Sequence, residues 1–576
     1  MGVAFGKSLI LDRSRVCVLK SELESSQVCG EIQRFRDAIQ KSKQQIQEIK
    51  ERAGKTADKF GVMLDTYSLM LEDEILVKDT IENIRNGHIN AEYAINMTLD
   101  KYVKLFDNIN DEYLKGKKDD LELVVQRIIR NLLGHEQETL DQVDQPVILV
   151  AHQLSPSDML TLDRRHIKGI VTEAGGKTSH LGIIASAMGI PAVVGAKEAT
   201  QKINSGDPII VDGIDGIVLI TPSEKDNRKY HKKRDNYESF EEKLLEGIQL
   251  PAETLDGYRI ELLANIESAH EIKTLSHFGA EGIGLYRTEF LYLGRQTLPD
   301  ENELYENFKK VVQGMDPQPI TIRTLDIGGD KIPHAIGLEE EDNPALGLRG
   351  IRMSLTYPEL LISQMKAILR ASIYGKIKIL YPMVSFASEI IEANLILDKV
   401  KSELRQSQFP FDESIQVGAM IETPASAISI DHILDQVDYI SIGTNDLIQY
   451  VLAVDRTNEN VAHLYQPFHP SIIKVLGKIF QAANLKDKKV SICGELGGDP
   501  LATELLLGLG KVNQLSMDPH SIPRIKKIIR SIRMDRATSL ADHVRTLSST
   551  DEINSYLSQE MKKILPFDFN RDTQHD

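Results

Sequence analysis

The sequence of 576 residues has no tryptophan and only three cysteines, Cys17, Cys29 and Cys493. None of them forms a CxxC pair, and none has the spacing of a metal site, so the cysteines exclude a disulfide framework and a zinc module. A sparse, odd set of cysteines in a long chain is typical of a reducing compartment. We therefore expect a cytoplasmic location.

Basic residues are also in deficit, because 68 Lys and Arg face 85 Asp and Glu and give a net charge of −17. This balance disfavours a general nucleic-acid binder, which needs a basic footprint, and it disfavours binding to an anionic membrane surface. No apolar run approaches the ~20 residues of a membrane span. Residues 1–7 lack the apolar core and cleavage site of a signal peptide. The length instead predicts about three or four globular domains.

Residues 19–135 predict a helical domain. From Leu23 to Ile46, apolar residues recur mostly at steps of three, four and seven, with polar residues between them. This spacing is typical of amphipathic helices. Segments near 56–87, 90–108 and 119–133 look similar, and Gly134 is suited to cap the last of them. We expect this domain to be inserted after a short strand at 8–11.

Residues 1–18 and 136–222 together predict a compact α/β domain. Its short β-rich runs lie at 147–150, 169–172, 192–194, 209–211 and 217–220. The very polar stretch 223–249 predicts a solvated linker helix. Residues 566–576 are expected to form a loose tail.

Residues 250–565 predict a closed (β/α)₈ barrel of the TIM type. Helical segments separate most of the eight strand candidates, which lie at 260–265, 282–286, 320–325, 377–382, 416–421, 439–443, 490–493 and 513–517. A repeated strand–helix pattern of this length is typical of such barrels. The fold class expected for the whole chain is therefore multidomain α/β.

Polar side chains recur where these strands end, which is the edge at which such barrels carry their chemistry. The set comprises Asn265, Arg287, Arg323, Asp326, Glu422, Asn445, Asp446, Arg456, Cys493 and Glu495. Its arginines are suited to phosphate and carboxylate. Glu422 and Asp446 supply two hard oxygens, which is about what Mg²⁺ takes from a protein. This pairing predicts a small substrate with both a phosphate and a carboxylate, and phosphoenolpyruvate is the obvious metabolite.

Cys493 is a candidate general acid. A buried cysteine is usually inert packing. At a strand end that faces an anion and a metal, however, it could supply a proton, because loss of phosphate from phosphoenolpyruvate leaves an enolate that must be protonated on carbon.

His180 is a candidate carrier of a covalent phosphoryl group. It closes the stretch Ala-Gly-Gly-Lys-Thr-Ser-His at 174–180, between a predicted strand and a predicted helix at 181–188. The glycines allow a tight turn, and the first N–H groups of a helix bind anions. Lys177 would help to balance the charge of the phosphoryl group. A P-loop is excluded because it needs glycine at Val171, whereas a plain helix cap stays open.

A series of motifs then resembles one family. The stretches GGKTSH (175–180) and GIPAVVG (189–195) resemble the phosphohistidine domain of phosphoenolpyruvate-using enzymes. The stretches GLYRTEF (284–290), RTLDIGGD (323–330), ETP (422–424), GTNDLIQY (443–450) and CGE (493–495) resemble their barrel. Together with EDE at 72–74, they make essentially the whole chain similar to Enzyme I of the phosphoenolpyruvate-dependent phosphotransferase system.

The resemblance implies a role for each candidate. His180 would be phosphorylated at Nε2, and Cys493 would protonate the enolate. The substrate would be held by Arg287, Arg323, Asn445, Asp446 and Arg456, and Mg²⁺ by Glu422 and Asp446. The helical domain would dock HPr, a small histidine phosphocarrier protein, and the barrel would form a homodimer. Because His180 must visit both the barrel and HPr, we expect a swivel about the linkers near 135–145 and 223–250.

Three positions depart from the family pattern. Lys177 stands where the family usually has arginine, Ser186 stands where it usually has a second arginine, and Glu122 replaces an expected basic residue. These changes concern the path from His180 to its partner more than the barrel. A divergent or regulatory system is therefore an open alternative.

Other functions stay open from the sequence. A phosphoenolpyruvate synthase or pyruvate phosphate dikinase shares the histidine domain and the barrel, but it needs a nucleotide-binding domain for which the helical region is too short and too poor in glycine. A degenerate regulatory phosphorelay protein would not need the proton donor Cys493. A lyase barrel would leave His180 unexplained.

Overall fold

The structure is a computed structural model of the chain. It describes residues 2–11, 18–71, 73–108, 112–134, 145–154, 166–173, 185, 189–292, 297–328, 341, 343–456, 458 and 460–565. Within its helices, the side chains of residues 49–66, 69, 74–75 and 104–120 are not described. The chain divides into two compact units, Met1–Ser239 and Phe240–Asp576. Each unit is described by itself below.

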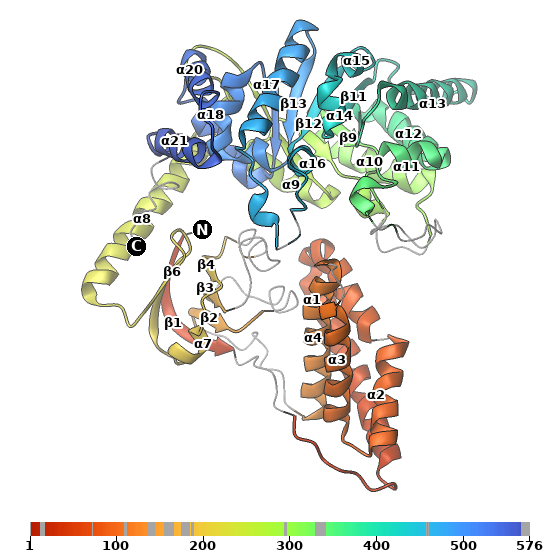
Figure 1. Cartoon of the computed structure of the whole chain (residues 1–576), viewed down its shortest axis with the longest axis vertical. Coiled ribbons are helices and arrows are strands. Elements are labelled where there is room, and N and C mark those ends of the chain that lie inside the picture. Colours follow the sequence, from red (N-terminus) through yellow and green to blue (C-terminus); the bar gives the residue numbers. More distant parts are fainter. Residues whose placement is uncertain are drawn as a thin grey trace. The chain divides into compact units, whose positions relative to one another are not determined.

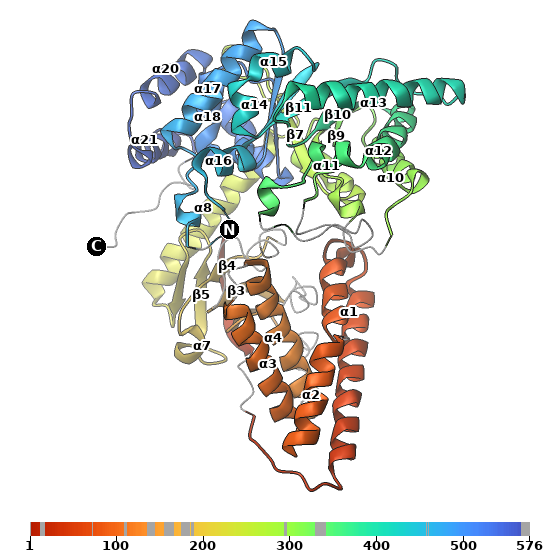
Figure 2. The ribbon, with the colours of Figure 1, turned by 45° about the vertical axis from the view of Figure 1, so that its right-hand side comes forward.

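Four helices form the helical part of the first unit (Figure 2). They are α1 (Val28–Leu71), α2 (Glu74–Gly87), α3 (Ala91–Asn108) and α4 (Glu112–Leu132). Their apolar stripes meet in one core, which includes Phe35, Ile84, Ile95 and Ile128. The helical prediction is confirmed, but the expected segment 56–87 is divided between α1 and α2. Its periodicity did not reveal this break.

Gly134 follows α4 in the left-handed conformation, with φ of 67°. Its N–H donates to the carbonyl of Asn131 at 3.3 Å. Glycine adopts this conformation without strain, which makes it a common residue just beyond a helix end.

A six-stranded sheet forms the other part of the first unit. Its order is β4-β3-β2-β1-β5-β6, with β1 (Val3–Leu11), β2 (Val147–Ala151), β3 (Ile167–Thr172), β4 (Ala192–Val194), β5 (Pro208–Asp212) and β6 (Ile217–Ile220). A short helix, α7 (Ala199–Lys202), precedes β5. Strand β1 pairs in parallel with β2 and antiparallel with β5. The four helices are thus an insertion between two neighbouring strands of one sheet.

The polar stretch after β6 forms the helix α8 (Glu224–Glu246), as the sequence predicted. Tyr230 is buried against Val3 and Ile210. The ring of His231 stacks on Phe5 with centroids 4.1 Å apart, and Lys233 pairs with Asp215 at 2.5 Å. The first part of α8 is therefore fastened to the sheet, and the division between the units falls within this helix.

The second unit is a closed barrel of eight parallel strands in chain order (Figure 1). The strands are β7 (Glu261–Ile266), β8 (Ile283–Tyr286), β9 (Ile320–Arg323), β10 (Ile377–Tyr381), β11 (Gln416–Ile421), β12 (Tyr439–Gly443), β13 (Lys489–Cys493) and β14 (Gln514–Met517). They match the eight predicted strands to within two residues at each end. The predicted multidomain α/β fold with a (β/α)₈ barrel is confirmed.

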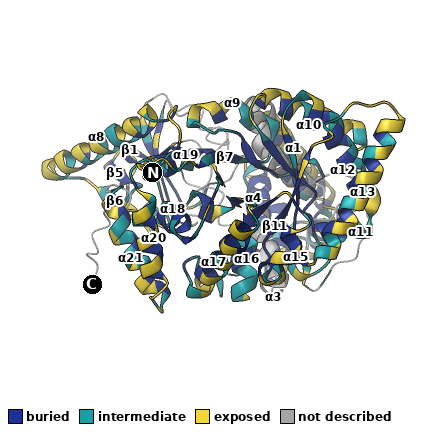
Figure 3. Cartoon of the chain, turned by 90° about the horizontal axis from the view of Figure 1, so that it is seen from above, coloured by how far each residue is buried: buried dark blue, intermediate teal, exposed yellow. Residues whose placement is uncertain are grey.

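Helices surround the barrel and bury its strands. They are α9 (Ile272–Leu275), α10 (Glu301–Met315), α11 (Ile351–Thr356), α12 (Pro358–Ala371), α13 (Ala387–Gln406), α14 (Pro424–Ile428), α15 (Ile430–Leu434), α16 (Thr444–Leu452), α17 (Pro470–Leu485), α18 (Pro500–Leu509), α19 (Ile522–Ile529), α20 (Met534–Val544) and α21 (Thr550–Lys562). Figure 3 shows exposed residues along α13, while the barrel strands are buried.

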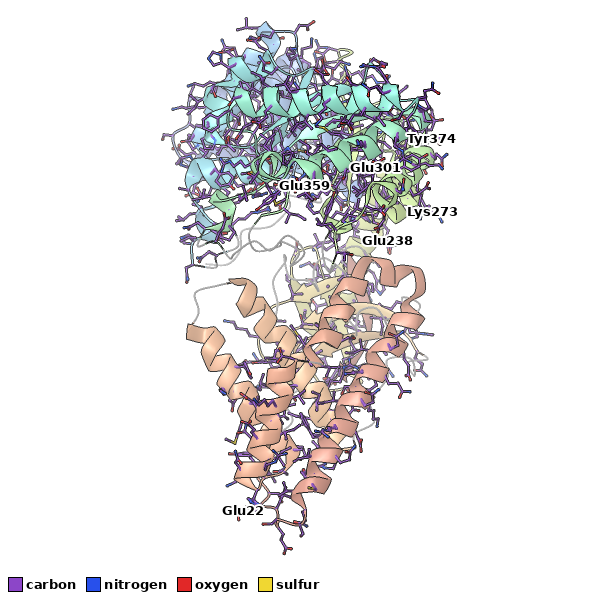
Figure 4. The ribbon with its side chains drawn as sticks, turned by 90° about the vertical axis from the view of Figure 1, so that its right-hand side faces the viewer. Glu22, Glu238, Lys273, Glu301, Glu359 and Tyr374 are labelled. Atoms are coloured by element: carbon purple, nitrogen blue, oxygen red, sulfur yellow. The ribbon has the colours of Figure 1, made fainter. Side chains whose placement is uncertain are left out.

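Polar pairs fasten neighbouring helices of the barrel. Glu301 of α10 and Tyr374, which follows α12, are both labelled in Figure 4. The guanidinium of Arg370 lies 2.5 Å from Glu301, and the hydroxyls of Tyr305 and Tyr374 lie 3.1 Å apart. In the part of the chain that the structure describes, no helix is both long and apolar enough to cross a membrane.

Candidate active site

The carboxyl ends of the barrel strands surround a cavity of about 310 Å³. Its lining includes every barrel residue for which the family resemblance implied a role, namely Arg287, Arg323, Glu422, Asn445, Asp446, Arg456 and Cys493. Asn265 and Glu495, which the sequence also singled out, are not part of this lining. The side chain of Asn265 accepts a hydrogen bond from Ser516 at 2.5 Å. The other strand-end positions picked from the sequence therefore converge on one cavity.

Arg323 is the deepest of the predicted arginines and ends strand β9. One of its terminal nitrogens lies 3.1 Å from Glu289 and the other 2.9 Å from Asp326. Burial alone would lower the pKa of Arg323, but these carboxylates outweigh it and raise the pKa. Its buried Nε has no partner among the described residues. Arg323 is thus a permanent cation with a donor left over for a ligand.

Arg349 joins two sides of the cavity, and it was not predicted from the sequence. It binds both carboxylate oxygens of Asp326, at 3.0 and 3.1 Å, and one oxygen of Asp446 at 3.0 Å. It comes from the loop between β9 and α11 and not from a strand end, where the predicted candidates lie. The signal that could have found it is Gly350, where a Cβ would lie 2.7 Å from the Cβ of Met383. Only glycine permits this close approach beside Arg349.

Glu422 follows strand β11 and is buried. Its Oε1 accepts the backbone N–H of Met383 at 2.5 Å. Its Oε2 would lie 2.5 Å from a Cβ at residue 443, so Gly443 leaves the room that this oxygen needs. Burial, followed by the nearby carboxylates of Asp446 and Asp326, raises the pKa of Glu422 to about 8. The site is therefore short of positive charge beside Glu422.

The acidic residues of the cavity fit a divalent cation. In the described part of the chain, no three His, Cys, Asp or Glu side chains form a ready-made metal cage. Glu422 and Asp446 nonetheless line the same cavity, and Mg²⁺ usually takes only one or two carboxylates and keeps its other positions for water and substrate phosphate. A cation there would favour the ionised form of Glu422, whose pKa is raised first by burial and then by the neighbouring carboxylates of Asp446 and Asp326.

Two further arginines are paired with glutamates that are partly or largely exposed. Arg287 lies 2.7 Å from Glu267, and Arg456 lies 3.3 Å from Glu495. The side chain of Asn445 also donates a hydrogen bond to Glu495 at 3.3 Å. Ion pairs that are open to solvent are weak, typically below about 1 kcal/mol. An anionic substrate could therefore replace Glu267 and Glu495 at little cost.

Cys493 is the last residue of β13 and is only 1% exposed. The hydroxyl of Ser441 donates to its Sγ at 3.3 Å, and the thiol donates to the carbonyl of Ile442 at 3.5 Å. Burial raises the pKa of Cys493 to about 11, although the bond from Ser441 acts in the opposite direction. The thiol is therefore protonated near neutral pH, as a proton donor must be.

The residues around the candidate phosphohistidine are not all described. His180, Lys177 and Ser186 lie outside the described residues. Just before them, Glu173 follows β3 and accepts hydrogen bonds from the backbone and hydroxyl of Thr200, at 2.8 and 2.6 Å. His152, which follows β2, lies 2.6 Å from the other oxygen of Glu173. Glu122 lies on α4.

Comparisons with known families agree with this geometry. Residues 242–534 match the PEP-binding domain of PEP-utilising enzymes, residues 143–216 match their mobile domain, and residues 1–117 match their N-terminal domain. PEP here stands for phosphoenolpyruvate. The matched domains define the class as PEP-utilising enzymes.

Curated relatives define the family within that class. The phosphoenolpyruvate-protein phosphotransferase of Haemophilus influenzae is 38% identical over 97% of both chains. That of Bacillus subtilis is 38% identical over 97% of this chain and 98% of its own. A solution NMR structure of an Enzyme I protein covers 41% of this chain and 96% of its own, with 34% identity and a TM-score of 0.36. The chain belongs to the phosphoenolpyruvate-protein phosphotransferase family, so the resemblance to Enzyme I is confirmed.

Proposed function

We propose that this chain is a phosphotransferase that takes the phosphoryl group of phosphoenolpyruvate onto His180 and passes it to a phosphocarrier protein of the HPr kind, releasing pyruvate. The observation that supports this most strongly is the barrel cavity, which combines arginines, two candidate metal ligands and a protonated thiol. Relatives of the same name that match almost the full length favour this function over a synthase or dikinase.

The arginines bind the substrate. Arg323 is buried and holds its charge, which suits the phosphate, while Arg287 and Arg456 exchange their glutamates for substrate oxygens. Asn445 and Asp446 complete the binding set, since both line the cavity. Arg349 orients Asp446, because one guanidinium joins it to Asp326.

Mg²⁺ is the cofactor of the proposed reaction, and Glu422 and Asp446 would hold it. When bound, it neutralises negative charge on the substrate. The buried carboxylate of Glu422 and its hydrogen bond from Met383 fix one ligand in place. The hydrogen bond from Arg349 fixes Asp446, the other ligand.

The chemistry balances with the residues of this chain. Nε2 of His180 attacks phosphorus, and the bond between phosphorus and the enol oxygen breaks, with the electron pair leaving on the enolate. Cys493 gives its proton to the methylene carbon, which makes pyruvate and leaves a thiolate that takes up a proton from solvent before the next turnover. The hydroxyl of Ser441 stabilises that thiolate through its hydrogen bond. In the second half-reaction, a histidine of the carrier attacks the phosphoryl group and His180 is restored.

The helical part of the first unit is the proposed docking surface for the carrier. Ser186 and Glu122 replace basic residues of the family pattern, so we expect slower transfer or a different choice of carrier. The domains proposed for these steps are residues 1–18 with 136–222, residues 19–135, and the barrel at 250–565, with a linker at 223–249. The substrate is a metabolite and the cysteines are sparse, so we place the enzyme in the cytoplasm.

The barrel is the proposed homodimer interface. Helix α13 exposes Ile391 and Leu395, one turn apart, at 44% and 64%, and Phe386 before it is 61% exposed. Ile428, at the end of α14, is 82% exposed. Large apolar side chains that are exposed one turn apart on a helix mark a candidate surface for a partner. A second copy of the chain is the partner that the family resemblance implies.

Labelling with two donors tests the proposed function. Phosphoenolpyruvate carrying ³²P, with Mg²⁺, should label the chain and release one pyruvate for each label, whereas ATP labelled in its γ- or β-phosphate should give none. Incorporation from ATP would instead identify a dikinase or synthase. Binding of phosphoenolpyruvate without label or pyruvate would identify a regulatory protein.

A further inference from the structure

A second cavity of the barrel unit lies outside the candidate active site. It has a volume of about 620 Å³ and lies between α17, the end of α18 and the segment that follows α20. Its lining consists of Pro470, Ile473, Lys474, Gly477, Lys478, Gln481, Leu509, Val544, Arg545 and Leu547. The volume is in the range of small-molecule sites, and none of these residues belongs to the lining of the site described above.

The charge of this cavity is unusual for the chain. Lys474, Lys478 and Arg545 line it, and no carboxylate does, although the net charge of the whole chain is −17. Lys474 and Lys478 lie one turn apart on α17, and neither has an ion-pair partner among the described residues. Arg545 binds Asp542 at 2.9 Å and the carbonyl of Leu509 at 3.3 Å, which hold its guanidinium in place. The two free ammonium groups and this fixed guanidinium would attract an anion.

The other residues of the lining are mostly apolar. Pro470, Ile473, Leu509, Val544 and Leu547 contribute hydrocarbon to the walls. A bare inorganic anion would gain nothing from them, whereas an apolar body would. The occupant that fits both features is an organic anion with an apolar body.

Gly477 gives a second, independent indication of a ligand. It lies in the interior of α17 (Pro470–Leu485), where glycine is less stable than alanine. Packing within the chain does not require it, because a Cβ there would meet only Nη2 of Arg545, at an ordinary contact distance of 3.6 Å. The missing side chain leaves open space beside Arg545, in the cavity that Lys474 and Lys478 also line. A residue that costs helix stability and keeps a cavity open is expected where a ligand must fit.

We propose that the cavity between α17 and α20 is a binding site for an organic phosphate or carboxylate with an apolar body, held by Lys474, Lys478 and Arg545 over Gly477. This site is separate from the proposed phosphotransfer function and does not depend on it.

The test is calorimetric titration of the full chain with three probes. 1-Naphthyl phosphate carries both features, 1-naphthol carries only the apolar body, and inorganic phosphate carries only the charge. We expect 1-naphthyl phosphate to bind at least about tenfold more tightly than either of the others. Equal affinity for all three probes would overturn the proposal.

Substitutions of lysine pairs test whether 1-naphthyl phosphate binds in this cavity. K474Q/K478Q should weaken the binding of 1-naphthyl phosphate by about tenfold or more. The control K225Q/K229Q removes the same charge from exposed lysines at the same spacing on α8 and should leave the affinity unchanged. A complex at the barrel mouth would survive K474Q/K478Q, and that result would contradict the proposal.

Gly477→Ala distinguishes a role of Gly477 in ligand binding from a role in the stability of the fold. It should raise the unfolding temperature, because alanine favours the helix, while it lowers the affinity for 1-naphthyl phosphate by filling the cavity. A more stable protein with unchanged affinity would show that Gly477 does not serve a ligand. Pyruvate formation should be the same in all these variants, since none of the changed residues lines the candidate active site.

Discussion

At the scale of single residues, the proposed reaction depends on keeping the buried thiol of Cys493 protonated and yet able to give up its proton. Burial raises the pKa of Cys493 to about 11, so the proton is present near neutral pH. Ser441 acts against this shift through its hydrogen bond to Sγ at 3.3 Å. One residue thus limits how unfavourable the thiolate becomes after the proton is transferred.

Ser441→Ala should raise the pKa of Cys493 further and slow pyruvate formation by about tenfold, the effect expected from losing one hydrogen bond to a charged sulfur. Ser491→Ala is a matched control. Ser491 pairs with Ser441 in the strand register, is also buried, and its hydroxyl has no partner among the described residues. The measurement is the pH dependence of Cys493 alkylation, together with single-turnover pyruvate release. Equal effects of the two substitutions would show that the bond to Cys493 is unimportant.

At the scale of elements, strand ends and helix starts carry the site. Helix α18 begins immediately after the loop that follows Cys493, and Asp499 caps it by accepting the N–H of Leu501 at 2.8 Å. Burial raises the pKa of this carboxyl to about 6, although the hydrogen bonds from Leu501 and Ala502 oppose the shift. The folded chain therefore prefers Asp499 protonated more than the unfolded chain does.

The sign of the resulting pH dependence follows from this raised pKa. The contribution of Asp499 to the free energy of unfolding is fully present below about pH 4, the range of the unfolded carboxyl, and is lost as pH rises through about 6. As the pH rises from about 4 to above about 6, the free energy of unfolding of the natural chain should fall by about 1 to 3 kcal/mol relative to that of Asp499→Asn. Denaturant unfolding of both chains at several pH values measures the difference. A difference that does not change with pH would contradict the expected pKa.

The barrel strands could be predicted because parallel strands are covered on both faces and appear as continuous apolar runs. Most of their polar ends could be predicted for the same reason, since most of these runs are followed closely by a charged or amide residue, whereas the β10 run is followed by Pro382 and Met383. Arg349 could not be predicted because it binds Asp326 and Asp446 from a loop, and loop residues have no periodic pattern. The break between α1 and α2 could not be predicted because the sequence has the same apolar spacing on both sides of it.

At the scale of the whole molecule, we propose that two copies of the chain pair through the barrel and that the two units move during the reaction cycle. Leu395→Glu should convert a dimer to a monomer, because it places a charge within the exposed apolar side chains of α13. Leu485→Glu is the control, since Leu485 is also an exposed leucine, at 79%, at the end of another helix. Sedimentation equilibrium distinguishes the two states. A dimer that survives Leu395→Glu would place the interface elsewhere.

Movement between the units is a separate expectation. His180 must reach the barrel cavity in one half-reaction and the carrier in the other, and the division between the units falls within α8. A chemical crosslink that joins the two units should therefore spare one half-reaction and abolish the other. Pyruvate release and transfer to HPr are measured separately on the crosslinked chain. If both continue at their normal rates, the swivel is wrong.

The phosphoryl group on His180 is the central claim, and intact-mass spectrometry tests it most directly. After incubation with phosphoenolpyruvate and Mg²⁺, the natural chain should gain the mass of one phosphoryl group. This group should be lost in acid and stable in base, as expected of phosphohistidine. His180→Ala should gain nothing while its fold, measured by circular dichroism, is unchanged. An equal gain of mass in His180→Ala, or a group that is stable in acid, would contradict the account.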